Sequence, residues 1–317
     1  MLNINIFKSI KISLRISLIA GLAVVSLLVL GGTFFSGDQL VGQAFQDQSE
    51  NEKLASLTKN IEVGTLQMRR REKDFLLRKS PKYLDLYLKD KDTVSTALLE
   101  LSSLNIAQNL QGEIERLQTN LQIHAEQFKK VFSLYQTMGL DEKSGLKGDL
   151  RAAVHQVEEQ LKAANLETLT IKMLMMRRHE KDFMLRGQDK YVTRIANRQT
   201  EFLEILKTAN IPETQKTELS GRLGSYVNKF GTWSSVFIQT QNETKKLSAI
   251  FKEMGPDFVT LFETAGIGLE RAKTDLTNVR NQTKSITIVV GSILLISSIL
   301  LSALITRSIT VPLGKVK

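Results

Sequence analysis

Two uncharged apolar runs, one near each end of the chain, constrain its fold more than any other feature. Ile16 to Phe35 contains 20 residues without a charged side chain, and Ile286 to Ile305 is a second run of 20. A helix needs about 20 apolar residues to cross a hydrocarbon core of about 30 Å. The alternative for the first run is a cleaved signal peptide, but the apolar run of a signal peptide is about 7–15 residues long. The alternative for the second run is a buried core helix. We therefore predict membrane-spanning helices at 16–35 and 286–306.

Basic residues that flank the two runs predict the orientation of the chain. Lys and Arg side chains close to the ends of spans stay on the cytoplasmic side of a membrane. Residues 1–15 contain three basic and no acidic side chains, and residues 307–317 also contain three and none. Both termini are therefore predicted to be cytoplasmic, and residues 36–285 to form one domain outside the membrane, which in a bacterium means the periplasm. This arrangement is typical of a receptor that faces outward and signals inward.

The composition excludes several classes of function. The net charge is +10, but six of the 43 basic residues flank the spans, so the segment between them is only mildly basic and nucleic-acid binding is not expected. The chain has no Cys and therefore no disulfide or thiolate metal site. The sequence has no metal-ligand spacing, phosphate-binding loop, or paired nucleophile and base. We predict no catalytic residue, metal or cofactor, and the chain is not expected to be an enzyme.

The segment between the spans is predicted to be all-α. Proline is rare, with 4 in 317 residues, and apolar side chains recur at alternating spacings of three and four, which is typical of helices packed in a bundle. Because the chain leaves and re-enters the same membrane, the number of antiparallel passes is even. The predicted fold is two stacked four-helix bundles that share long helices. The expected reversals are at Pro81, Asn105, Asn165, Gly187 and Pro212, with kinks at Gly139–Gly148 and Gly255-Pro256.

A charged motif occurs twice in this segment. Residues 68–78 read MRRREKDFLLR, and residues 176–186, which begin 108 positions later, read MRRHEKDFMLR. Such fidelity without a gap indicates an internal duplication, with one motif on a helix in each half. In each copy a glutamate, Glu72 or Glu180, falls on the apolar face of its helix, with an arginine one turn earlier.

The charges of the motif have two explanations, and the sequence leaves both open. Guanidinium groups on rigid helices bind carboxylates through paired, charge-assisted hydrogen bonds. The candidate ligand-binding residues are Arg69, Arg70, Arg177, Arg178 and His179. Alternatively, the arginines pair with acids of their own motif in buried ionic networks that set the helix register. The candidate network residues are Glu72, Asp74, Glu180 and Asp182. His179 replaces Arg71 in the second copy, so the two copies need not bind the same ligand.

These features resemble bacterial methyl-accepting chemotaxis receptors that have a helical bimodular sensor domain. The resemblance rests on the two spans, on the duplicated Arg-Arg-x-Glu-Lys-Asp-Phe motif, and on the segment 139–158 with Arg151, His155 and Glu158. In addition, 307–317 resembles the start of a HAMP linker, with Pro312 after the second span. Nearly the whole chain is covered.

The resemblance implies a receptor for chemotaxis that acts as a homodimer and senses a small-molecule ligand. The known ligands of the family include small organic acids, which by position would meet Arg69 and Arg70, and less directly Arg177 and Arg178. The denser charge of the motifs and their built-in Glu72 and Glu180 depart from the acid-sensing members. Cytoplasmic signalling proteins would be reached only through a region beyond Lys317. The alternatives are the sensor region of a membrane histidine kinase and a non-signalling, membrane-anchored helical protein.

Overall fold

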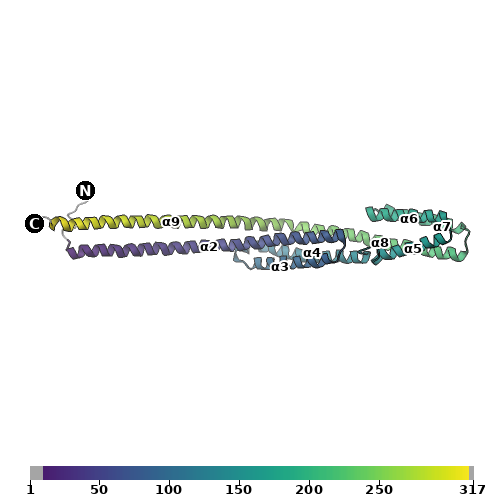
Figure 1. Cartoon of the computed structure of the whole chain (residues 1–317), viewed down its shortest axis with the longest axis horizontal. Coiled ribbons are helices and arrows are strands. Elements are labelled where there is room, and N and C mark those ends of the chain that lie inside the picture. The colour runs from purple at the N-terminus through teal and green to yellow at the C-terminus, as the bar shows by residue number, and fades with distance from the viewer. Residues whose placement is uncertain (1–9, 314–317) are drawn as a thin grey trace. The chain divides into compact units, whose positions relative to one another are not determined.

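A computed structural model describes residues 10–313 of the chain. Within this range the all-α prediction is confirmed, because the elements are helices joined by short turns and no strand is present (Figure 1). Residues 1–9 of the predicted cytoplasmic N-terminus and residues 314–317 of the predicted HAMP linker lie outside the described residues. The helices are α2 (Ile12–Arg78), α3 (Lys82–Ser102), η1 (a 3-10 helix, Asn105–Leu110), α4 (Gln111–Met138), α5 (Gly145–Ala163), α6 (Glu167–Arg186), α7 (Lys190–Thr208), α8 (Glu213–Glu253) and α9 (Gly255–Leu313).

The helix ends follow the predicted breakers. Lys79, two residues before Pro81, has a φ of 56°, and Asn165 between α5 and α6 has a φ of 50°. Gly187 ends α6 in the left-handed conformation (φ 62°), where a residue without a Cβ has no steric cost. Pro212 directly precedes α8, where its fixed φ fits the start of a helix. Four of the five predicted reversals therefore fall between consecutive helices, and the fifth, Asn105, is the first residue of η1, which joins α3 to α4.

The two predicted kinks differ in size. The first is a break of six residues between α4 and α5, in which Gly139 has a φ of 109°. A Cβ on Gly139 would lie 2.2 Å from the Ser144 carbonyl oxygen, so only glycine fits this turn. The second kink is reduced to one turn residue, Met254, between α8 and α9.

The chain forms two compact units, of which the first contains the described residues of 1–56, 104–106 and 262–317. It is built mainly from the first part of α2 and the last part of α9. Each of these helices is long and apolar enough to cross a membrane, and the apolar window is unburied in α2 and almost unburied in α9. This exposure contradicts the core-helix alternative for the second run. Inside the unit, Arg15 Nη1 donates to the Ser308 carbonyl oxygen (3.1 Å).

The second unit contains residues 57–103 and 107–261 and holds two bundles, which we call the first and second modules. The first module packs the last part of α2 with α3, α4 and the last part of α8, with Phe75 of α2 against Phe128 of α4. The second module packs α5, α6, α7 and the first part of α8, with Phe183 against Phe230 and Trp233 in its core. Helix α8 contacts both α4 and α5, so the modules share it (Figure 1).

Candidate ligand-binding pocket in the second module

The two glutamates of the duplicated motif are among the most buried residues of the chain. Glu72 is 0% exposed and Glu180 is 1% exposed. In each module the arginine one turn earlier donates to the glutamate, Arg69 to Glu72 and Arg177 to Glu180. A buried carboxylate needs such a partner, because an uncompensated charge in a bundle core is strongly destabilising.

The other members of the motif lie on the surface of their modules. Arg70 and Arg178 are exposed, whereas the two glutamates are buried. Asp74 lies 3.9 Å from Arg70 and 3.6 Å from Arg78, and Asp182 lies 3.9 Å from Arg186. Exposed pairs of this spacing on a helix contribute only about 0.3–0.5 kcal/mol each. Arg70, Arg178 and the two aspartates therefore support their helices without converging on a site.

In the first module the Arg–Glu pair is enclosed by its own bundle. Arg69 Nη2 lies 3.4 Å from Ser248 Oγ, and its guanidinium covers the ring of Phe251 at 4.9 Å. Glu72 Oε2 lies 3.4 Å from Nε2 of the buried His124. The hydroxyl of Tyr87 in turn lies 2.6 Å from His124 Nδ1. The residues that engage Arg69 and Glu72 thus come from α3, α4 and α8, which is the arrangement expected of a structural network.

Electrostatics keep this network charged. Burial opposes ionisation of Glu72, but the hydrogen bond from His124 and the charges of Arg69 and Lys73 outweigh it and lower the pKa of Glu72. Burial, followed by the charge of Glu72, raises the pKa of Tyr87. The module therefore holds a carboxylate anion beside a neutral phenol, and Tyr87 Oη can donate to His124.

In the second module the equivalent pair borders a cavity of about 210 Å³. Its wall is built by α5, α6 and the turn that precedes α5. The lining residues are Glu142, Lys147, Leu150, Arg151, His155, Arg177, Glu180, Lys181 and Met184. The Arg–Glu pair is therefore enclosed by side chains of its own bundle in the first module, whereas in the second module it borders a polar cavity.

The cavity carries more basic than acidic side chains. Arg151 Nη1 lies 2.7 Å from Glu142 Oε2, and Lys181 Nζ lies 3.6 Å from Glu180 Oε1. In the described part of the chain Lys147 has no ion pair, although it lines the cavity. The two carboxylates therefore leave part of the positive charge unmatched, and this excess favours an anionic ligand.

Neighbouring side chains connect the cavity to its surroundings. Glu158, outside the lining, lies 3.8 Å from Arg177 Nε and 3.5 Å from His155 Nδ1. Tyr226 of α8 is buried beside the Arg177–Glu180 pair, and burial, followed by the charge of Glu180, raises its pKa well above the ordinary value. The phenol of Tyr226 is therefore neutral, and it links the pair to the helix that both modules share.

His179 lies outside the cavity and takes part in a different cluster. Its ring centroid is 6.4 Å from that of Tyr191 on α7. Burial, followed by the charges of Arg194, Arg178 and Arg198, lowers the pKa of His179. Of the five candidate ligand-binding residues, Arg177 lines this cavity together with other cations, and His179 does not.

The sequence reasoning missed most of the residues that complete this cavity. Lys147, Lys181 and Glu142 were not identified, and Arg151 and His155 were singled out only through the family resemblance. A signal was present, because Lys147, Arg151 and His155 follow one another at spacings of four, which places them on one stripe of a helix. The position of Arg177 opposite that stripe depends on the packing of α5 on α6, which spacing does not reveal.

The cavity beside Arg177 is small and polar, and its lining comes from two helices and one turn of a single module. No protein-family model matches the chain, and no curated protein matches it significantly.

Proposed function

We propose that this chain is the sensing and membrane-anchored part of a receptor that detects a small organic acid for chemotaxis. The observation that carries the proposal is the contrast between the modules. The Arg–Glu pair of the first module is enclosed by its bundle, whereas the equivalent pair of the second module borders a cationic cavity. The ligand site is the cavity lined by Lys147, Arg151, Arg177 and Lys181. Its role is binding without catalysis.

The cavity suits a small carboxylate. Guanidinium groups hold carboxylates through two parallel hydrogen bonds, and both Arg151 and Arg177 line the cavity. Lys147 forms no ion pair in the described residues, so it can bind the ligand without first breaking one. A volume of about 210 Å³ limits the ligand to a small molecule. Glu142 and Glu180 repel an anion that does not engage the basic residues fully, which adds selectivity.

Helix α8 provides the route for a signal. It carries Tyr226 beside the Arg177–Glu180 pair and is followed, after the single residue Met254, by α9 with its apolar window. An anion that competes with Glu180 for Arg177 changes the contacts around Tyr226. A ligand that binds one packing of α8 better than another shifts the population toward that packing, and we infer that this displaces α9.

The membrane placement forms part of the proposal. The exposed apolar windows of α2 and α9 support a membrane protein, and the flanking basic residues support cytoplasmic termini with 36–285 in the periplasm. In this arrangement the receptor is a homodimer in the bacterial inner membrane. The segment 307–317 begins a HAMP linker that leads to cytoplasmic signalling proteins.

Calorimetric titration of the full chain in lipid nanodiscs tests the ligand site. The probes are acetate, succinate and citrate, which carry one, two and three carboxylates. Replacing Lys147 or Arg151 with Ala should weaken the binding probe by about 10- to 100-fold, because each removes one charge-assisted contact. Arg70→Ala, which removes an exposed arginine of the first module, is the matched control and should leave binding unchanged. Equal losses in all three variants, or no binding of any probe, would sink the proposal.

A further inference from the structure

The α6–α7 side of the second module differs in charge from the equivalent α2–α3 side of the first. His179 of α6 stands where α2 has Arg71. The 108-residue offset extends into the next helices, because the first residues of α3 and α7 are also 108 positions apart. Under this offset Arg198 of α7 takes the place of Asp90 of α3. Both of these facing positions have therefore changed, and the acid has become a base.

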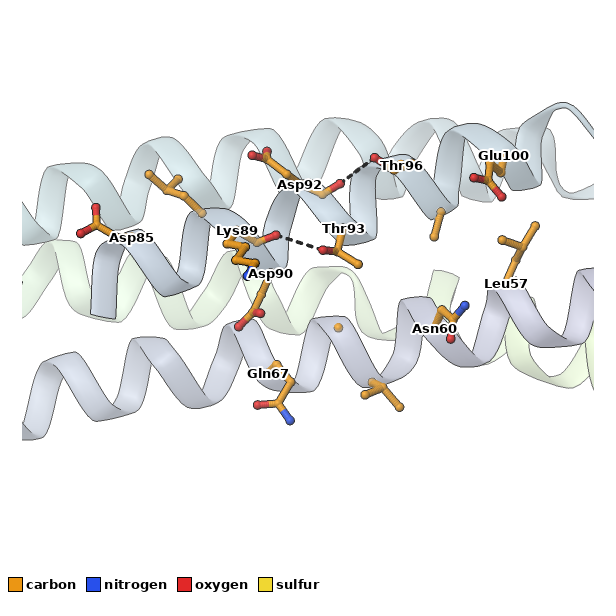
Figure 2. A pocket seen from close by; sticks show the side chains of 14 residues that line it. Leu57, Asn60, Gln67, Asp85, Lys89, Asp90, Asp92, Thr93, Thr96 and Glu100 are labelled. Atoms are coloured by element: carbon orange, nitrogen blue, oxygen red, sulfur yellow. Dashed lines mark hydrogen bonds between the residues drawn. The ribbon is translucent and has the colours of Figure 1, made fainter. Parts of the chain in front are cut away.

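In the first module the two positions form an ion pair on an acidic surface. Arg71 Nε lies 3.2 Å from Asp90 Oδ2. Asp90 lines a groove of about 1100 Å³ between α2 and α3 (Figure 2). Three further acids of α3 line the same groove, namely Asp85, Asp92 and Glu100. The second module has threonines at the equivalent positions 193, 200 and 208, so it lacks these negative charges.

In the second module basic side chains outnumber acidic ones at this place. Glu201 of α7 accepts hydrogen bonds from Lys172 at 2.6 Å and from Arg198 at 2.5 Å. Arg194 is exposed, lies over the ring of Tyr191 at 5.4 Å, and forms no ion pair with any described residue. Three cations therefore share one carboxylate, which leaves an excess of two positive charges.

His179 lies next to this excess of charge. After burial, the charges of Arg194, Arg178 and Arg198 lower its pKa, so the imidazole is neutral at pH 7. Asp182, which acts in the opposite direction, lies 3.9 Å from an arginine of its own helix. The ring of His179 forms no hydrogen bond with another described residue. The imidazole therefore has unused hydrogen-bonding capacity beside unmatched guanidinium groups.

We propose that His179, Arg194 and Arg198 form a second anion site, between α6 and α7, for a divalent oxyanion of the phosphate type. The bound anion takes the place that the carboxylate of Asp90 has in the first module, where the negative charge is built into the chain. An excess of two positive charges matches a divalent anion. Guanidinium groups bind phosphate through paired, charge-assisted hydrogen bonds, and a tetrahedral anion presents oxygens to donors on both helices.

This site is separate from the carboxylate cavity of the proposed function. The cavity is lined by α5, α6 and the turn before α5, and none of its lining residues belongs to the α6–α7 site. The two sites can therefore be occupied together.

Calorimetric titration of the full chain in lipid nanodiscs, at constant ionic strength, tests the site. The probes are inorganic phosphate, sulfate and glycerol phosphate. Arg194→Ala should weaken phosphate binding at least about tenfold, because it removes a charge-assisted contact. Arg70→Ala, an exposed arginine of the first module, is the matched control and should leave binding unchanged. Binding of glycerol phosphate extends the site to phosphate esters, and its exclusion limits the site to free ions; both results support the proposal.

A double variant tests whether the anion replaces the missing carboxylate. His179→Arg combined with Arg198→Asp installs the residue types that form the ion pair of the first module, so the chain should stay helical by circular dichroism. The new aspartate then neutralises the arginines from within the chain, and phosphate should bind at least about 100-fold more weakly. Unchanged phosphate binding in this variant, or no phosphate binding by the unmodified chain, would overturn the proposal.

Histidine modification locates the bound anion. Diethyl pyrocarbonate modifies accessible neutral imidazoles, and mass spectrometry reports each histidine separately. Phosphate at ten times its Kd should slow the modification of His179 about tenfold. His155, whose side chain is 53% exposed and which lines the carboxylate cavity, should react at an unchanged rate. Protection of His155 without protection of His179 would place the anion in the cavity and contradict the α6–α7 site.

Carboxylate binding by the double variant separates the two proposals. Neither of its substitutions changes a residue of the cavity, so acetate, succinate or citrate should bind as to the unmodified chain. A chain that binds a carboxylate but no phosphate overturns only the α6–α7 site. A chain that binds phosphate but no carboxylate overturns only the carboxylate cavity.

Discussion

At the scale of single residues, the two copies of one motif lie in different surroundings. The pair of Arg69 and Glu72 is completed by His124, a side chain of its own module, whereas the pair of Arg177 and Glu180 borders a cavity. A buried carboxylate must be neutralised in both cases. The difference lies in what else touches the arginine, because neighbours that satisfy every donor make a structural network and an open side leaves donors for a ligand. The contacts therefore support the network interpretation in the first module and the ligand interpretation in the second.

This contrast predicts different costs for the same substitution. Glu72→Gln leaves the partly buried Arg69 without its carboxylate and should lower the free energy of unfolding by about 3–5 kcal/mol. Glu180→Gln should cost less, because Arg177 borders a cavity where water or an anion can replace the lost charge. Urea unfolding followed by circular dichroism compares the two variants. Equal losses would show that the two pairs have equivalent surroundings.

At the scale of elements, α8 connects the modules, and Glu243 ties it to α4. Gln127 Nε2 donates to both the carbonyl oxygen and Oε2 of Glu243, at 2.9 and 2.8 Å. Lys246 and Lys130 lie 2.9 and 3.2 Å from its carboxylate. The hydrogen bonds from Gln127 and Lys246 are the main cause that lowers the pKa of Glu243 from 4.5 to about 2. The ionised form is therefore favoured in the folded chain.

Stability should fall in acid because of this residue. The pKa of Glu243 is lower in the folded than in the unfolded chain, so its contribution is present above pH 4.5 and is lost as the pH falls toward about 2. Urea midpoints measured at about pH 5 and pH 3 should therefore drop less in Glu243→Gln than in the unmodified chain. Glu72, whose pKa is also lowered, accounts for part of the remaining drop. Identical drops in the two proteins would contradict the assignment.

At the scale of the whole molecule, the chain combines helices that bury their apolar faces with two that do not. The helices of the modules hide Leu, Phe, Tyr and Met side chains in bundle cores. The apolar windows of α2 and α9 are exposed instead. Exposed apolar surface of this extent is costly in water and neutral in lipid. The placement of both windows in a membrane is the arrangement that removes this cost.

The predicted topology can be tested by labelling single introduced cysteines, because the native chain has no cysteine. Thr119→Cys places an exposed thiol on α4, and Thr310→Cys places one after the second apolar run. In intact bacterial cells, a maleimide that does not cross membranes should label position 119 and leave position 310 unlabelled. Both should react once the cells are opened. Labelling of position 310 in intact cells would reverse the predicted orientation.

The sequence by itself determined the local features of this protein. The uncharged runs, the helix breaks at Pro81 and Gly187, and the burial of Glu72 and Glu180 all follow from residues close together in the chain. A helix places residues at fixed intervals, so its buried face and its ends can be identified without knowledge of its neighbours.

Only the tertiary structure decided which side chains surround the duplicated motif in each module. Arg69 is engaged by Ser248, a residue 179 positions away on α8, and Arg177 borders a cavity to which α5 contributes Lys147 and Arg151. Two nearly identical motifs have the same local preferences, and their surroundings differ through the side chains that other helices bring to them.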